Sequence, residues 1–226
     1  MKKQTVVLGM ILTLSLTLVV IGATRRLSRR APITTQSVAA QKSDAQDMRP
    51  LKDKAKGSRN FTELKYPTRG LASSDLAELA NRSSDVIIGT PVENISRLSA
   101  DGRSITLDYQ VRVEYVYKGA VKQGKIITVS LPGGKLMFDD GSIAEVQTPW
   151  FKKMLNDKTY ALFLTPGAGA GKFTTASEAQ GVFEIPTTKD SQAVNIHSGI
   201  KGDAMLQYQG MNVRTFLKEV RRTTRK

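Results

Sequence analysis

Apolar and polar residues alternate over residues 104–117, with Val116 as the one apolar residue among the polar positions. Side chains on a β-strand point to opposite faces in turn, so this pattern predicts a strand with one face on a core and one in water. The apolar positions are Ile105, Leu107, Tyr109, Val111, Val113, Tyr115 and Tyr117. The register predicts buried side chains at Tyr109, Val111 and Val113 and exposed side chains at Gln110 and Arg112.

This strand is long for a small domain. Its length would be about 46 Å, whereas a common strand has about 5–6 residues. Long coiled strands are typical of small closed barrels, in which one strand serves both halves of the barrel. Residues 100–102, Ala-Asp-Gly, predict a hairpin turn before it, with residues 86–98 as the partner strand. Gly89 and Pro91 interrupt that partner, so we expect a bulge or a sheet edge near them.

The rest of the chain alternates short strands with turns, with a helix near each end. Ser74 can cap a short helix over 75–82, and Asn212 can cap a final helix with one apolar stripe. That stripe consists of Val213, Phe216, Leu217 and Val220. Further expected elements are strands at 126–131, 160–164, 173–176 and 181–185, a hairpin of 135–138 with 142–146, and a helical turn over 148–155. The run at 160–164 is apolar throughout, which indicates a strand buried on both faces.

The N-terminal 24 residues predict a targeting segment. Lys2 and Lys3 precede an apolar run at 5–23, longer than the usual apolar core of a signal peptide and close to the length that spans a bilayer. We expect residues 1–24 to be either a signal peptide or an N-terminal membrane anchor. A buried core helix is the remaining alternative. The protein is then exported, and either membrane-anchored or periplasmic or extracellular. Residues 25–73 are polar, basic and without apolar periodicity, which predicts a disordered linker.

The formal net charge of +14 is concentrated at the ends of the chain. Residues 1–74 carry +10 and residues 214–226 carry +5, whereas residues 75–213 carry −1. A domain that grips a phosphate backbone needs a basic face of its own, so nucleic acid is not the expected partner. Basic ends fit a membrane surface or an anionic envelope polymer, or they are solubilising tails. The final helix, 212–226, either docks on the barrel or lies on a membrane or partner.

Four segments occur in the order Ser84–Gly89, Tyr109–Val113, Tyr117–Gly119 and Tyr160–Leu164. In these segments the chain resembles netrin-like modules and tissue inhibitors of metalloproteinases, which are OB-fold barrels. Residues 131–134, 149–151 and 180–183 are similar to exported bacterial domains of unknown function. The resemblance covers roughly residues 75–185 and implies a fold rather than an activity. The inhibitors act through an N-terminal cysteine, and this chain has no cysteine, so their mechanism is not inherited.

The strand pattern and the resemblance together predict a mainly β domain over residues 74–211. We expect a small closed or partly open OB-like β-barrel with a short N-terminal helix and a C-terminal amphipathic helix.

Candidate catalytic and ligand-binding residues are few. His197 is the only histidine, and with Asp139 and Asp140 it would supply the groups of a hydrolase, although a hairpin turn is the alternative for the two aspartates. Trp150 and Phe151 are a possible ligand platform of the kind OB-folds use for bases or sugars, with core packing or a barrel plug as the alternative. Residues 167–172, Gly-Ala-Gly-Ala-Gly-Lys, depart from the phosphate-loop pattern. We assign no catalytic residue, metal ligand or cofactor.

The sequence thus predicts a non-catalytic binding or scaffolding domain of the bacterial cell envelope. The expected partner is an envelope protein or an anionic polymer, with the N-terminal segment contacting the membrane. An envelope hydrolase and a nucleic-acid-binding OB-fold are the alternative hypotheses.

Overall fold

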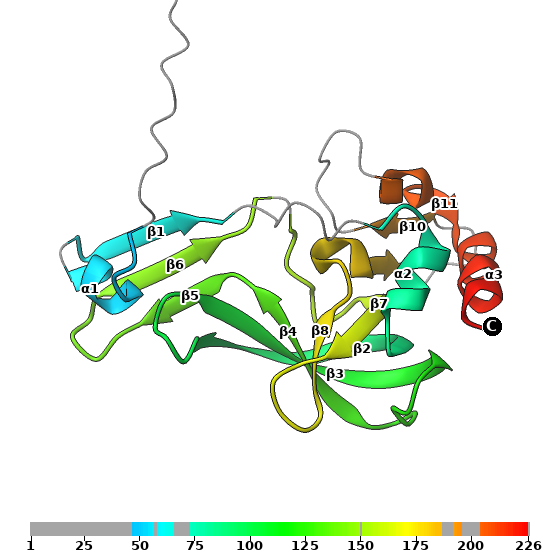
Figure 1. The fold of residues 1–226 in the computed structure, drawn as a ribbon, viewed down its shortest axis with the longest axis horizontal. Helices are drawn as coiled ribbons and strands as arrows, with labels where there is room; N and C mark the ends of the chain where they lie inside the picture. The colour runs from blue at the N-terminus through cyan, green and yellow to red at the C-terminus, as the bar shows by residue number, and fades with distance from the viewer. Residues whose placement is uncertain are drawn as a thin grey trace, which may run out of the picture. The chain divides into compact units, whose positions relative to one another are not determined.

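The computed structural model describes residues 47–56, 58–65, 73–149, 151–186, 192–195 and 204–225. The targeting segment predicted at residues 1–24 lies outside them. Among the described residues, no helix is both long and apolar enough to cross a membrane. Residues 46–226 form one compact unit, and the structure is mainly β, as the sequence predicts (Figure 1).

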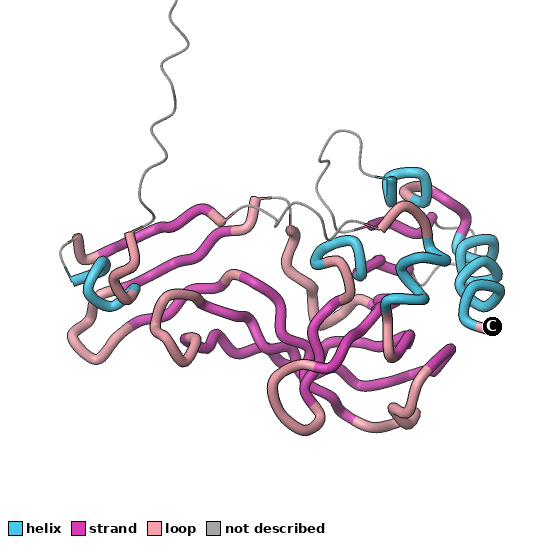
Figure 2. Tube along the Cα trace, in the orientation of Figure 1, coloured by secondary structure: helices cyan, strands magenta, loops and turns pink. Residues whose placement is uncertain are grey.

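The secondary-structure elements follow the predicted order, with additions before residue 65 and after residue 190. The strands are β1 (Asn60–Leu64), β2 (Asp85–Leu98), β3 (Ile105–Lys118), β4 (Ile126–Pro132), β5 (Gly134–Met137), β6 (Ile143–Gln147), β7 (Thr159–Pro166), β8 (Lys172–Thr175), β9 (Val182–Ile185), β10 (Gln192–Asn195) and β11 (Met211–Asn212). The helices are α1 (Leu51–Lys56), α2 (Leu76–Arg82) and α3 (Val213–Thr224), with 3-10 turns η1 (Glu178–Gly181) and η2 (Ala204–Tyr208). Figure 2 shows how strands dominate the fold.

The long hairpin of β2 and β3 is the frame of the molecule. The two strands pair antiparallel from Val86 and Lys118 to Leu98 and Ile105, with register shifts after Val86, Ile88 and Pro91. The predicted bulge near Gly89 and Pro91 is therefore confirmed. A Cβ atom on Gly89 would lie 2.6 Å from Val111 Cγ1, so the backbones approach more closely there than any side chain allows.

The predicted alternation along β3 holds in its first two thirds. Tyr109, Val111 and Val113 are buried and Arg112 is exposed, as predicted, whereas Gln110 is half-buried. Beyond Val113 the prediction is wrong, because Tyr115 is 45% exposed. The pairing with β2 skips residues 114 and 117, and each skipped residue changes which face the next side chains occupy.

Five strands close into a ring in the order β2, β3, β4, β8, β7. Pairing of β7 with β8 completes the ring, and β4 with β8 is its one parallel pair. Three consecutive antiparallel strands followed by a strand that returns beside the first is a Greek-key order. Apolar residues from all five strands fill the inside, among them Ile87, Tyr109, Val129 and Leu162. We call this closed part of the sheet the ring.

A second hydrophobic cluster lies on the other side of β2 and β7. Strand β7 is buried on both faces, as predicted: Leu162 faces the ring interior and Phe163 faces the second cluster. Helices α2 and α3 cover this cluster. The rings of Phe183 and Phe216 lie 4.8 Å apart. Thus the apolar face of α3 docks on the folded domain, the first of its two predicted alternatives.

A three-stranded sheet, β1-β6-β5, forms a third cluster with α1. Its presence corrects the prediction of a disordered linker over residues 25–73 for the stretch from α1 to β1. Leu51 and Ala55 are fully buried, and the Leu51 N–H donates to the Gly102 carbonyl at 2.8 Å. Two apolar residues at this spacing are too few for a periodic pattern, which is why the sequence of this stretch predicts a linker.

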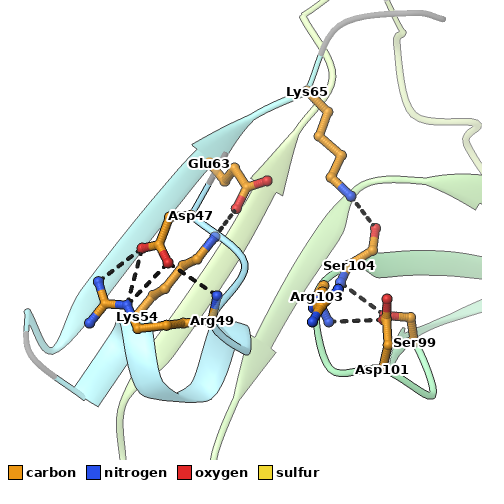
Figure 3. A network of polar contacts seen from close by, with 9 residues as sticks. All are labelled: Asp47, Arg49, Lys54, Glu63, Lys65, Ser99, Asp101, Arg103 and Ser104. Atoms are coloured by element: carbon orange, nitrogen blue, oxygen red, sulfur yellow. Dashed lines mark hydrogen bonds and ion pairs between the residues drawn. The ribbon is translucent and has the colours of Figure 1, made fainter. Parts of the chain in front are cut away.

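Polar contacts also fasten this N-terminal stretch (Figure 3). Lys54 Nζ donates to Glu63 Oε2 at 3.2 Å and is largely buried. Lys65 Nζ donates to the Ser104 hydroxyl at 2.6 Å, which joins the end of β1 to the turn between β2 and β3. Within that turn, Asp101 accepts from the Ser99 hydroxyl and the Arg103 amide.

Two local predictions are corrected. The N-cap of α2 is Asp75, which accepts from the Glu78 N–H at 2.8 Å. Ser74, predicted as the cap, lies one residue earlier and donates to the Glu78 carboxylate instead. The helical turn predicted over 148–155 is not found in its described residues, 148–149 and 151–155, beyond a single bond from the Phe151 N–H to the Thr148 carbonyl.

Two charged side chains hold the end of the hairpin: Asp85 binds the loop after β3, and Lys118 binds the end of α2. Asp85 is buried and accepts from the Ala120 and Val121 amides at 2.8 and 3.1 Å. Lys118 Nζ donates to the Ala80 and Ser83 carbonyls at 2.7 and 2.6 Å, at the C-terminal end of α2, where cations are favourable. The Ser-Asp and Lys-Gly motifs of the family resemblance are therefore structural here.

We predict that Gly119→Ala is strongly destabilising. Gly119 has φ +107, and a Cβ atom there would lie 1.9 Å from Asp85 Oδ1, so the substitution adds a clash to a backbone strain of about 1–3 kcal/mol. Gly124→Ala is the matched control, since Gly124 has φ +80 and nothing within 4 Å. Urea denaturation should show a clearly larger loss for Gly119→Ala, and equal losses would contradict the proposed tie.

We predict that Leu51→Ala lowers the free energy of unfolding by about 2–5 kcal/mol, because it empties a buried site. Leu64 is 51% exposed, so Leu64→Ala should change stability by only about 0.5 kcal/mol. Thermal and urea denaturation of both variants measure the difference. A Leu51 variant as stable as the Leu64 variant would mean that α1 does not dock in solution.

Candidate functional site

The aromatic pair proposed as a ligand platform is only partly within the described residues. Trp150 lies outside them. Phe151 is half-buried and packs against the cluster inside the ring, which agrees with the alternative of core packing. It also lines a cavity of about 200 Å³ between the ring and β6. Most of the other lining residues are apolar or glycine, and the polar ones are Glu145, Gln147, Thr148 and Lys153.

The segment after Phe151 inserts into the ring. Met154 is buried in the interior cluster. Its N–H donates to the Tyr109 hydroxyl at 3.1 Å, and the Leu155 N–H donates to the Tyr160 hydroxyl at 2.8 Å. Burial raises the pKa of Tyr109 to about 12 and also raises the pKa of Tyr160. In a helical turn these two N–H groups would donate to backbone carbonyls. Here they donate to the two tyrosine hydroxyls instead.

The residues of the hydrolase hypothesis are not assembled into a site within the described residues. Asp139 and Asp140 are exposed in the tight turn between β5 and β6, the alternative considered for them. The Ser142 hydroxyl and amide both donate to Asp140 Oδ1 and lower the pKa of its carboxyl. His197 lies outside the described residues. Among the described residues, no group of three or more potential metal ligands occurs.

A polar face on the outside of the ring is the strongest candidate site. Its residues come from strands that the fold places side by side. The residues next to them in the sequence point into the ring and fill its interior. We define the polar face as Arg97 of β2, Thr106, Asp108, Gln110 and Arg112 of β3, Thr128 and Ser130 of β4, and Lys172 and Thr174 of β8.

Asp108 is the electrostatic centre of the polar face. Its side chain is only 4% exposed, although it lies among polar residues on the outer face of β3. Oδ2 lies 3.0 Å from Arg97 Nε and 3.8 Å from Lys172 Nζ, and Oδ1 accepts from the Ser130 hydroxyl at 2.6 Å. Both cations keep about half of their side-chain surface in solvent, at 55% and 43% exposed, so they can still contact a ligand.

The Gln110 amide extends this network along the face. It donates to the Thr128 hydroxyl at 3.1 Å, which explains why Gln110 is half-buried. Arg112, two residues further along β3, is exposed. Hence the face carries three cations and one buried carboxylate, with hydroxyl and amide groups between them.

An open depression of about 540 Å³ adjoins the polar face. Most of the lining surface is apolar, and six of the lining residues carry a hydroxyl group: Thr106, Ser130, Thr165, Thr174, Thr175 and Ser177. The Thr165 and Thr174 hydroxyls are 3.0 Å apart. Arg82 and Glu178 contribute the charged groups of the lining.

The backbone at one wall of the depression is strained. Ser177 and Glu178 have φ of 55° and 53°, values that non-glycine residues rarely adopt. Ser73 contacts this wall: its hydroxyl lies 2.8 Å from the Ser177 hydroxyl, and its N–H donates to Gln180 at 2.7 Å. Strain of this kind concentrates at functional sites.

The sequence contained one signal for this site. The polar positions of the alternating β3 pattern are Thr106, Asp108, Gln110 and Arg112. Alternation alone predicts only that their side chains face solvent. Only the pairing of β3 with β4, and of β4 with β8, brings Ser130 and Lys172 beside Asp108. The Gly-rich loop before Lys172 connects β7 to β8, between two strands, in agreement with the rejection of a phosphate loop.

Comparison with known proteins adds no relative to this description. No family model matches the sequence, and no curated protein matches it.

We predict that the free energy of unfolding falls as the pH rises from about 10 to about 12. The folded state holds the Tyr109 proton up to about pH 12, whereas the unfolded chain releases it near pH 10, so a shift of this size is worth about 2–3 kcal/mol. Tyr109→Phe should lose this part of the pH dependence. It should also be less stable by about 1–3 kcal/mol at neutral pH, because the Met154 N–H loses its acceptor.

Tyr115→Phe is the control, since Tyr115 is exposed, and it should retain the pH dependence of the parent chain. Urea denaturation at several pH values measures all three proteins. An unchanged pH dependence in Tyr109→Phe would contradict the assignment.

Proposed function

We propose that the ring is an OB-type barrel and that the chain is a non-catalytic binding domain of the bacterial cell envelope. The order of the five strands, with its Greek key and its parallel β4–β8 pair, supports the fold. OB-folds bind oligosaccharides and oligonucleotides on the face of their second and third strands and on the adjoining loops. Here these strands are β3 and β4, which supply most of the polar face. This coincidence is the observation that carries the proposal.

The chemistry of the polar face favours an anionic polymer that also carries hydroxyl groups. Arg97, Arg112 and Lys172 offer partly solvated cationic groups, and the one carboxylate, Asp108, is buried beneath two of them. Neighbouring hydroxyls and the Gln110 amide can exchange hydrogen bonds with sugar hydroxyls. Acidic polysaccharides of the envelope combine both groups.

The same face gives little support to nucleic-acid binding. Single-stranded nucleic acids are held by aromatic side chains on which bases stack, and none of the residues that define the polar face or line its depression is aromatic. The envelope location rests on the sequence of residues 1–24, whose apolar run follows two lysines.

We predict that the full chain binds polygalacturonate, an acidic polysaccharide, more tightly than neutral dextran. Arg112→Gln combined with Lys172→Gln should weaken polygalacturonate binding by about tenfold, or about 1.4 kcal/mol, because it removes two of the three cationic groups. Isothermal titration calorimetry at low and moderate salt measures the change.

The matched control is Lys122→Gln with Lys125→Gln, which removes the same charge from the exposed loop between β3 and β4. Equal weakening in both double variants would mean generic charge attraction and would refute the polar face as the site. Tighter binding of a single-stranded DNA oligonucleotide, lost in the polar-face variant, would favour the nucleic-acid alternative.

A further inference from the structure

The exposed side of α3, with its C-cap Arg225, carries a stripe of four basic residues. Arg214, Lys218, Arg221 and Arg225 follow the helical spacing i, i+4, i+7 and i+11, which places them on one face. All four are exposed. In the part of the chain that the structure describes, none of them forms an ion pair with an acidic side chain. We call these four residues the basic stripe.

Neighbouring charges do not neutralise the stripe. The one acidic residue of α3, Glu219, is held by Arg222, whose Nε donates to Glu219 Oε2 at 3.0 Å. Arg222 lies beside the stripe on the helix surface. The positive charge of the stripe is therefore open to a partner outside the domain.

The opposite side of α3 is already occupied. Phe216 and Val220 are fully buried in the cluster beneath α2 and α3, and Thr223 is buried with them. An amphipathic helix that lies in a membrane interface must insert its apolar face. Because this face packs on the domain, α3 can meet an anionic surface only through its charges.

An exposed aromatic residue adjoins the stripe. Tyr115 is 45% exposed, and its ring centroid lies 4.7 Å from that of Tyr117. Tyr117 packs against the same cluster as α3. Strand β3, which carries both tyrosines, contacts α3 directly, so the tyrosine pair lies near the helix that carries the stripe. Tyrosine is enriched where proteins meet the headgroup region of a bilayer.

We propose that the basic stripe, with Tyr115 beside it, is the surface by which the domain lies against an anionic phospholipid membrane. Each basic residue near such a surface strengthens the association about fivefold. Two such residues thus account for about a 25-fold shift. The sequence of residues 1–24 would supply a separate attachment if it remains as an anchor, which raises the local concentration of the stripe at the bilayer.

The test uses the full chain in lipid vesicles. Since the chain has no cysteine, Thr215→Cys on the exposed start of α3 provides one site for a donor fluorophore, and headgroup-labelled lipid provides the acceptor. Energy transfer should be higher in vesicles with roughly a third phosphatidylglycerol than in pure phosphatidylcholine, and salt should reduce the difference. Lys218→Gln combined with Arg221→Gln should abolish most of it.

Two matched double variants keep the test specific. Lys52→Gln with Lys56→Gln removes the same charge from exposed positions of α1 and should leave the transfer unchanged. The polar-face pair, Arg112→Gln with Lys172→Gln, should also leave it unchanged, which separates this proposal from the polymer-binding function. Equal transfer in both lipids, or equal loss in the α1 and α3 variants, would overturn the proposal. The proposal would also be overturned if the stripe bound soluble polygalacturonate and energy transfer showed no preference between the two lipids.

Discussion

The fold depends on the bend in β2 between Gly89 and Val92. Up to Gly89, β2 pairs with β7 on one side and β3 on the other, and it belongs to the ring. Beyond the bend it pairs with β3 alone and carries the hairpin toward α1 and the three-stranded sheet. No side chain fits at Gly89, because Val111 occupies the position of its Cβ atom. Because Gly89 has no side chain, β2 can approach β3 closely at this point. The same strand can therefore continue from the ring into the second packed region.

A second consequence of this arrangement is that apolar residues on both faces of β2 and β7 are buried. Val86 faces the cluster under α2 and α3, whereas Ile87 faces the ring interior. The ties from Asp85 and Lys118 hold α2 and the loop after β3 at this junction. A buried charge such as that of Asp85 needs such partners, and half-buried Lys118 binds two carbonyls at the end of α2, so both residues serve the fold. Their roles in the fold leave the ligand open.

The candidate site could be foreseen only in part. Alternation along β3 names the polar residues Thr106 to Arg112, and a short-range pattern can do no more than assign them to the solvent side. The burial of Asp108 arises because Arg97 and Lys172 come from strands that the ring brings alongside β3. Closure of the ring pairs strands that are far apart in the sequence, and no local pattern predicts which strands will pair. The same reason explains Tyr115, whose exposure follows from a skipped residue in the pairing with β2.

By itself the sequence determined the long β2–β3 hairpin, the doubly buried β7, the apolar stripe of α3 and most strand positions, because these follow from the period of the side chains along each element. The tertiary structure decided the rest. It ordered α1 and β1, where two buried side chains of α1 pack in a cluster with residues of the three-stranded sheet. It kept residues 151–155 out of a helix, because Tyr109 and Tyr160 supplied acceptors for the Met154 and Leu155 amides. It also assigned one side of α3 to the core and left the basic side free, since packing consumes whichever face is apolar and leaves charge to solvent.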